Sequence, residues 1–192
     1  MKYFFLFFLC TISLSVYAQN SVDEQIRFAS MAAPEEYRDG AKVYGWDENE
    51  EPIILREGTN QFVCVADNPK TRFQVSCYHE SLEPFMNRGR ELRKEGKNPQ
   101  EIFDIREEEA LNGTLQMPEK PAALHVYYGD DVRYNSETNT LEGAKYRYVV
   151  YIPFATEEST GIPVRPNAPG HPWLMNPGTH RAHIMITPQY SN

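Results

Sequence analysis

The C-terminal third of the chain alternates apolar and polar residues in a way that predicts extended strands. Three segments are rich in Val, Ile, Tyr and Phe: Ala122 to Tyr128, Lys145 to Phe154 and Ala182 to Thr187. Such residues favour strands, and turn-forming residues bound each segment. A proline-rich stretch, Thr156 to Thr179, separates the last two segments. A loop of this length in a compact domain is usually functional or disordered, and the apolar residues Trp173 to Met175 favour packing on the body.

The first half of the chain carries two further pairs of predicted strands. Ala41 to Tyr44 precedes Ile53 to Arg56, with an acidic turn at residues 47–51 between them. Phe62 to Ala66 precedes Phe73 to Cys77, and residues 67–70 (Asp-Asn-Pro-Lys) form the intervening turn. Short apolar runs separated by Asp, Asn, Pro and Gly are typical of hairpins. We therefore expect two hairpins before the central helices.

Helical periodicity predicts three helices. The first runs from Val22 to Ala32 and ends before a proline, and the second begins at Ser81 and ends at Gly96. The third, Pro99 to Leu111, has the clearest start signal: an Asn cap, proline at the first helical position, and a glutamate placed to return the cap's hydrogen bond. Together the elements predict an α+β domain, in which an antiparallel sheet has two or three helices packed on one face and one disulfide.

The first 18 residues read as a secretory signal peptide. Lys2 supplies a positive charge, Tyr3 to Val16 is apolar, and residues 16–18 end in a small-x-Ala cleavage site before Gln19. A membrane anchor is the alternative, but the apolar run is shorter than the roughly 20 residues that span a bilayer. The sequence therefore predicts a signal peptide at residues 1–18, one domain at 19–192, and a periplasmic or secreted location without membrane insertion after cleavage.

Net charge narrows the class of partner. The chain has a formal net charge of −8, and removal of Lys2 makes the mature part more acidic still. An acidic protein of this kind is a poor partner for nucleic acid or anionic membranes. We expect a small molecule, a glycan or a peptide as partner, and the sequence makes no prediction of oligomeric state.

Only two cysteines stay in the mature chain. Cys10 leaves with the predicted signal, and Cys64 and Cys77 lie in the two strands of one predicted hairpin. In an oxidising compartment such a pair forms a disulfide, with Cα atoms about 4.4–6.8 Å apart. Two free buried thiols, or a nucleophilic cysteine, are the alternatives.

Catalytic signatures of the common enzyme classes are absent from the sequence. It has no Gly-x-Ser-x-Gly, no His-Glu-x-x-His, no phosphate-binding loop and no dinucleotide fingerprint, and it predicts no cofactor. His171 and His180 lie in or beside the proline-rich stretch and are candidates for binding zinc or copper. The alternative is that they are solvent-exposed or hydrogen-bonded loop histidines.

The strand pattern suggests a ligand-binding face. Most aliphatic residues of the C-terminal strands share one phase, and polar or aromatic residues share the other. If the strands adjoin in matching register, helices cover the aliphatic face. The opposite face then presents the candidate ligand-binding residues His125, Tyr127, Arg147, Tyr151 and His183. An ordinary half-exposed antiparallel sheet gives the same pattern and is the alternative.

One sequence block carries a resemblance. Leu55 to Asn60, Cys64, the Asp67-Asn68-Pro69 turn, Cys77 and the ending His183-Ile184-Met185 resemble a group of uncharacterised exported bacterial proteins. These share a Gly-Thr-Asn turn and a paired-cysteine loop. The resemblance implies export and a disulfide, and it implies no activity or site residue.

The leading functional hypothesis is an exported ligand-binding or accessory module. It would use the polar-aromatic sheet face and the proline-rich stretch. The alternative is a hydrolase, metal-assisted through His171 and His180, and the sequence does not decide whether the protein is an enzyme.

Overall fold

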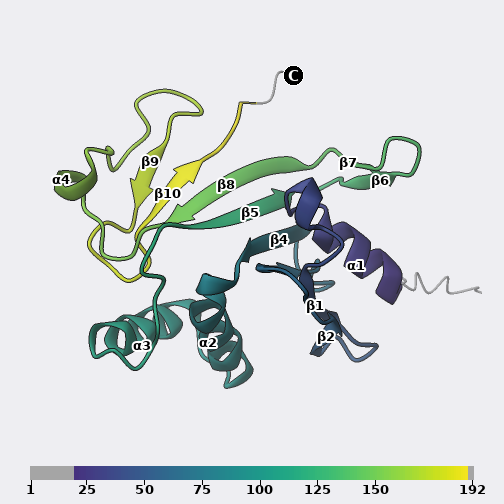
Figure 1. Ribbon diagram of the computed structural model, residues 1–192, viewed down its shortest axis with the longest axis horizontal. Helices are drawn as coiled ribbons and strands as arrows, with labels where there is room; N and C mark the ends of the chain where they lie inside the picture. The colour runs from purple at the N-terminus through teal and green to yellow at the C-terminus, as the bar shows by residue number, and fades with distance from the viewer. Residues whose placement is uncertain (1–19, 190–192) are drawn as a thin grey trace, which may run out of the picture.

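The computed structural model describes residues 20–189. The predicted signal peptide lies outside this range and stays a prediction. Within the described residues, eight strands form one sheet in the order β2-β1-β3-β4-β5-β8-β10-β9, and β6 and β7 form a separate hairpin (Figure 1). The strands are β1 Lys42–Trp46, β2 Pro52–Arg56, β3 Phe62–Val65, β4 Gln74–His79, β5 Ala122–Tyr128, β6 Arg133–Asn135, β7 Thr140–Glu142, β8 Lys145–Tyr151, β9 Trp173–Met175 and β10 His183–Ile186.

The α+β fold class is confirmed, although the sheet is mixed rather than wholly antiparallel. Strands β1 and β3 are parallel, and the other neighbouring strands are antiparallel. The exception arises because the β1–β2 hairpin places β2 at the edge, so β3 must pair with the inner side of β1. Thr59 and Asn60 donate their backbone N–H groups to the carbonyl of Gly40, at 2.8 and 3.2 Å, and hold this crossing.

The helices cover both faces of the sheet. The α-helices are α1 Val22–Ser30, α2 Glu83–Lys94, α3 Pro99–Leu111 and α4 Glu157–Thr160, and the 3-10 turns are η1 Glu35–Tyr37 and η2 Glu80–Leu82. Neighbouring residues of β4 show the division. Buried Cys77 contacts Ala29 of α1, whereas Tyr78 packs in the same cluster as Phe85 of α2. Figure 1 shows α2 and α3 together beneath the sheet and α1 beside β4. Two helices share one face as predicted, and α1 packs on the other.

Local signals explain the helix starts. Ser21 and Asn98 each accept a hydrogen bond from the backbone three residues on, and a glutamate at that position returns a bond to the cap's N–H. The predicted helix Pro99–Leu111 is confirmed with both bounds. These caps are local in sequence, which is why the pattern alone locates them.

The predicted disulfide between Cys64 and Cys77 is confirmed. The two residues are direct partners across the antiparallel β3–β4 pair, and both are fully buried. Their Cα atoms are 4.0 Å apart, slightly closer than we expected, because they oppose one another on adjacent strands. The bridge lies under α1, in the cluster that also contains Ala29 and Val75.

The two edges of the sheet differ. At one edge, an earlier part of the proline-rich stretch lies against the outer side of β9. The backbone N–H of fully buried Leu174 there donates to the carbonyl of Pro163 at 2.9 Å. The predicted packing of this stretch on the body is therefore observed, with α4 and β9 as elements that the sequence analysis did not foresee. At the other edge, β2 exposes Ile53 and Ile54, at 39% and 45%. A search of residues 20–189 finds no helix with the length and apolar character to cross a membrane.

Candidate functional site

The five candidate ligand-binding residues do not share one face of the sheet. Strand β5 pairs His125 with Tyr148 and Tyr127 with Tyr146, so these residues point to the side of α1. Register places the other three on the α2 side, where they adjoin the helix-packed core: Arg147, Tyr151 and His183. The prediction of a single surface is therefore wrong. The prediction places the odd-numbered residues of β5 and β8 on one face. In the observed register, odd-numbered residues of β5 oppose even-numbered residues of β8, and a shift of one residue exchanges the two faces of a strand.

On the α1 side, His125 belongs to a row of aromatic rings. Its Nδ1 lies 2.5 Å from the Tyr146 hydroxyl, and its ring is 4.8 Å from that of Tyr148. Tyr127 packs at 5.2 Å from Tyr146. Burial lowers the pKa of His125, so the imidazole is neutral at physiological pH. These rings are half-buried against one another, which fits the half-exposed sheet that was the alternative interpretation.

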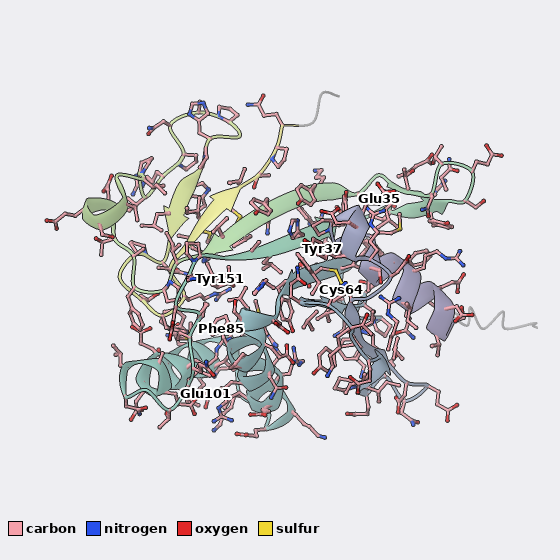
Figure 2. The ribbon with its side chains drawn as sticks, viewed as in Figure 1. Glu35, Tyr37, Cys64, Phe85, Glu101 and Tyr151 are labelled. Atoms are coloured by element: carbon pink, nitrogen blue, oxygen red, sulfur yellow. A yellow bond between two sulfur atoms is a disulfide. The ribbon has the colours of Figure 1, made fainter. Side chains whose placement is uncertain are left out.

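On the α2 side, Tyr151 is the centre of a buried cluster. Its ring lies 5.5 Å from Phe85 of α2 and 5.2 Å from His183 of β10. Figure 2 shows Tyr151 and Phe85 one above the other in the layer between the sheet and α2. His183 donates from Nδ1 to the carbonyl of Arg181 at 2.7 Å. Burial raises the pKa of Tyr151 and lowers that of His183. Tyr151 and His183 thus meet as predicted, but inside the molecule.

Arg147 lies on the same face, nearer the other end of β8. Its guanidinium stacks 4.5 Å above the ring of Tyr128, and its Nε is buried without a hydrogen-bond partner in the described part of the chain. Four residues along a strand separate it from Tyr151, so the two side chains belong to different neighbourhoods. Arg147 is therefore held by stacking on an aromatic ring and does not join the Tyr151 cluster.

The histidine candidates for metal binding are separated by structure. His171 is exposed in the proline-rich stretch, whereas His180 is fully buried between Phe85 and Phe103. The backbone N–H and Nδ1 of His180 both bond to the carboxylate of Glu107 in α3. Among residues 20–189, no group of three or more His, Cys, Asp or Glu side chains is placed to hold a metal ion. His171 and His180 therefore do not form the predicted site.

His180 has one further property that bears on chemistry. Its Nε2 is buried and has no hydrogen-bond partner among the described residues. Burial lowers the pKa of His180 most strongly, and Arg106 and Arg181 act in the same direction, while Glu107 opposes them. The ring is thus neutral, with Nδ1 donating to Glu107 and Nε2 carrying a free lone pair.

Sequence reasoning missed Arg106, which lies behind the same cluster. It is buried, at 6% exposed, although it lies one turn after Ile102 on the helix face that packs inward. Its Nη1 donates to the carbonyl of Phe85 at 3.1 Å, and its guanidinium lies 4.0 Å above the Phe85 ring. An arginine at an inward position of the helical period was the available signal.

A groove opens on the other side of α2. It has a volume of about 1260 Å³ and runs between the start of β1 and β3, the end of β4, the start of α2 and the segment 116–123. Apolar side chains from Phe62, Met117 and Pro118 line it together with polar side chains. The groove therefore forms at one end of the sheet, where strands β3, β4 and β5 meet the N-terminus of α2.

A closed network of polar groups supports one wall of the groove, and two of its members, Tyr44 and Glu83, line it. Glu83 accepts hydrogen bonds from the hydroxyls of Tyr44 (2.8 Å) and Tyr78 (2.5 Å) and forms an ion pair with Arg90 (2.5 Å). Arg90 also donates to the Tyr78 hydroxyl at 2.9 Å and stacks 4.3 Å above the Tyr44 ring. Burial raises the pKa of both tyrosines, so they stay protonated donors. Each polar group of the network therefore has a partner, and the charges of Glu83 and Arg90 cancel.

A histidine cap completes the groove near η2. His79 Nδ1 accepts from the backbone N–H of Ser81 at 3.2 Å and lies 2.9 Å from its hydroxyl. Because both contacts are local, they terminate β4 and start η2. His79 and Ser81 then line the groove as part of its frame.

Comparisons of this chain with models of known protein families, with curated proteins and with solved structures found no match. Function is therefore inferred from the chemistry of the site itself.

Proposed function

We propose that this chain is an exported binding module whose groove beside α2 holds a short peptide in an extended conformation. The predicted signal peptide supports export. So does the buried disulfide Cys64–Cys77, because such bonds persist in oxidising compartments. The groove supports binding, because concave sites with a few fixed polar groups are typical of ligand sites.

The observation that carries the proposal is the pre-organised wall of the groove. Glu83 and Arg90 neutralise one another and hold two tyrosine hydroxyls in place before any ligand arrives. A site that is already ordered loses less conformational entropy on binding. Such a wall selects its ligand by shape and hydrogen bonding rather than by net charge.

The rest of the lining favours a peptide over a ligand of one charge. Both signs occur at the rim, with Lys42 and Lys120 against Glu80 and Glu119. Apolar contacts come from aromatic, Met and Pro side chains, including Phe62. An extended peptide offers one donor and one acceptor per residue, along with apolar side chains and termini of both charges. Its chemistry therefore complements each part of the groove.

The hydrolase alternative receives no specific support. His171 and His180 are far apart in environment, and the two Glu107 bonds occupy Nδ1 and the backbone N–H of His180. We therefore advance the binding module alone.

Selection from a random peptide library displayed on phage tests the proposal. The purified chain should enrich peptides with a common apolar pattern. Gln116→Trp places a large ring at the groove and should abolish the enrichment, because Gln116 is exposed and lines the groove. Gln100→Trp is the matched control, since Gln100 is exposed at the start of α3 and outside the lining. Enrichment that survives Gln116→Trp, or no enrichment at all, would contradict the proposal.

A further inference from the structure

Three arginines lie where α2, α3 and the segment before β10 meet. The guanidinium groups of Arg93 (α2) and Arg106 (α3) both approach Gly89, at 3.8 and 3.0 Å from its Cβ position. Arg181 directly follows His180, which bonds to Glu107 of α3 and packs on Phe85 of α2. Within residues 20–189, none of the three has an ion pair. The chain has 27 acidic residues and 19 lysines and arginines, so carboxylates are in excess overall. The three arginines therefore lack an ion pair because of their position in the fold, and not because the chain is short of carboxylates.

Arg106 forms the back of the cluster. It contacts two backbone carbonyls, of Phe85 at 3.1 Å and Ile102 at 3.4 Å, and neither carries a full charge. Gly89 of α2 makes room for it: a Cβ at that position would lie 3.0 Å from Arg106 Nη1. Burial, reinforced by Arg181, lowers the pKa of Arg106 to about 10, which still leaves it charged at neutral pH. A buried guanidinium without a counter-ion is unfavourable unless another group supplies the charge.

Two of the acidic residues that follow Arg106 in α3 are already engaged by other groups. Glu107 accepts both hydrogen bonds from His180. Glu109 accepts three hydrogen bonds from Arg88, between 2.8 and 3.0 Å. Both carboxylates are therefore engaged by other residues, and Glu109 raises the pKa of Arg106 less than burial and Arg181 lower it.

Arg181 connects the buried and exposed parts of the cluster. Its side chain is exposed and interacts with the hydroxyl of buried Tyr151. The positive charge of Arg181 lowers the pKa of Arg93 and Arg106, because a nearby like charge disfavours the charged form of each guanidinium. An arriving anion relieves this repulsion, and Arg181 and Arg93 are accessible to it from solvent.

We propose that Arg93, Arg106, Arg181 and Tyr151 form a binding site for an oxyanion, the phosphate, sulfate or carboxylate group of a small soluble molecule. Guanidinium groups pair with such groups through two parallel hydrogen bonds, and the tyrosine hydroxyl supplies a further donor. Three positive charges favour a doubly charged group over a single carboxylate. None of these four residues lines the peptide groove, so the two sites can be tested separately.

Titration of the purified chain with inorganic phosphate, followed by NMR, tests this site. Ionic strength is held constant with sodium chloride, and parallel titrations use sulfate and acetate. The expected result is a saturable shift of the signals of residues 93, 106, 151 and 181. Arg181→Gln, at an exposed position, should weaken phosphate binding by about tenfold or more. Arg72→Gln removes an equal charge beside Asp130, at the far end of β5, and should leave binding unchanged.

The titrations can support or overturn the anion site. Saturable shifts that Arg181→Gln removes and Arg72→Gln preserves support the site. Acetate binding as tight as phosphate binding would keep the oxyanion site but overturn the preference for a doubly charged group. Shifts that rise linearly with concentration, or that are equal in Arg181→Gln and wild type, overturn the proposal. Because neither variant lines the groove, peptide selection on Arg181→Gln distinguishes failure of this site from failure of the peptide site.

Discussion

The two sides of helix α2 treat buried charge in opposite ways. On the groove side, Glu83 and Arg90 form an ion pair, and two tyrosine hydroxyls satisfy the remaining oxygen positions. On the β10 side, buried Arg106 has no ion pair within the described residues, and His180 Nε2 has no hydrogen-bond partner there. We call the first network closed, because each of its polar groups has a partner. We call the second open, because Arg106 has no counter-ion and His180 Nε2 has no hydrogen-bond partner among residues 20–189.

We infer that the paired network on the groove side stabilises the fold, whereas the unpaired groups on the β10 side serve binding. A closed buried network holds the fold in one shape, and breaking it leaves charges without partners. A buried network with unpaired groups lowers the free energy of unfolding, and natural proteins retain such groups mainly at functional sites. We therefore expect substitutions on the groove side to lower the free energy of unfolding strongly. Substitutions on the cluster side should change binding or pH dependence with little loss of stability.

The largest effect is expected at the closed network. Glu83→Ala removes the shared acceptor of Tyr44, Tyr78 and Arg90 and should lower the free energy of unfolding by about 2–4 kcal/mol. Urea denaturation followed by circular dichroism measures this loss. Glu91→Ala is the control, because Glu91 is exposed and pairs with Arg88 at 3.3 Å, so its loss should be below about 1 kcal/mol. Equal losses in the two variants would contradict the comparison.

A double-mutant cycle tests whether the cluster side is built around its arginine. Gly89→Ala normally strengthens a helix by about 0.5–1 kcal/mol, but here the new Cβ meets Arg106 Nη1 at 3.0 Å. We expect Gly89→Ala alone to destabilise the protein by about 1 kcal/mol. In an Arg106→Met background the same change should be neutral or stabilising. Arg106→Met alone should stay within about 1 kcal/mol of wild type, since it removes an unpaired buried charge.

Acid should destabilise the protein through the cluster side. Burial holds the pKa of His180 and His183 below their ordinary value of 6.5, so the unfolded chain binds protons more readily than the folded chain as the pH falls below 6.5. The free energy of unfolding should therefore be fully retained above pH 6.5 and decrease on acidification through that value. Glu107 opposes this effect at His180, whereas Arg106 and Arg181 reinforce it.

Melting temperatures between pH 7.5 and 5 measure the effect. His180→Phe fits between Phe85 and Phe103 and should flatten the dependence. His171→Phe should leave it unchanged, because His171 is exposed. A steeper dependence in His180→Phe would show that the sign is reversed.

The smallest expected change is at Arg181. Arg181→Gln removes an exposed charge that repels Arg93 and Arg106, but it also removes an interaction with the Tyr151 hydroxyl. The two effects oppose one another, so the free energy of unfolding should change by less than about 0.5 kcal/mol. Chemical denaturation without phosphate measures it. A loss above about 1 kcal/mol would show that Arg181 stabilises the fold, and that the cluster is not open.

Local signals made part of this fold predictable. The α3 helix followed from Asn98, Pro99 and Glu101, because cap chemistry depends only on neighbouring residues. The disulfide followed from Cys64 and Cys77 in one hairpin. Interactions between residues close together in the sequence determine these features, so a few neighbouring positions suffice to predict them.

Long-range features were not predictable in the same way. Strand β8 has Tyr and Val in both phases, so its pattern does not determine that Tyr148 opposes His125. The inward position of Arg106 depends on Gly89 of another helix, and the engagement of His180 depends on Glu107, 73 residues away. Such contacts arise only when packing brings distant segments together, and no spacing in the sequence reports them.

The unlike edges of the sheet have a consequence for self-assembly. Strand β2 offers an unpaired edge with Ile53 and Ile54 exposed, while the Pro163 carbonyl closes the outer side of β9. Exposed apolar edges can template cross-strand joining between molecules. Within the eight-stranded sheet of residues 20–189, two copies that joined through β2 would present β9 at both outer ends. We therefore expect strand addition through this sheet to favour a pair over a longer polymer.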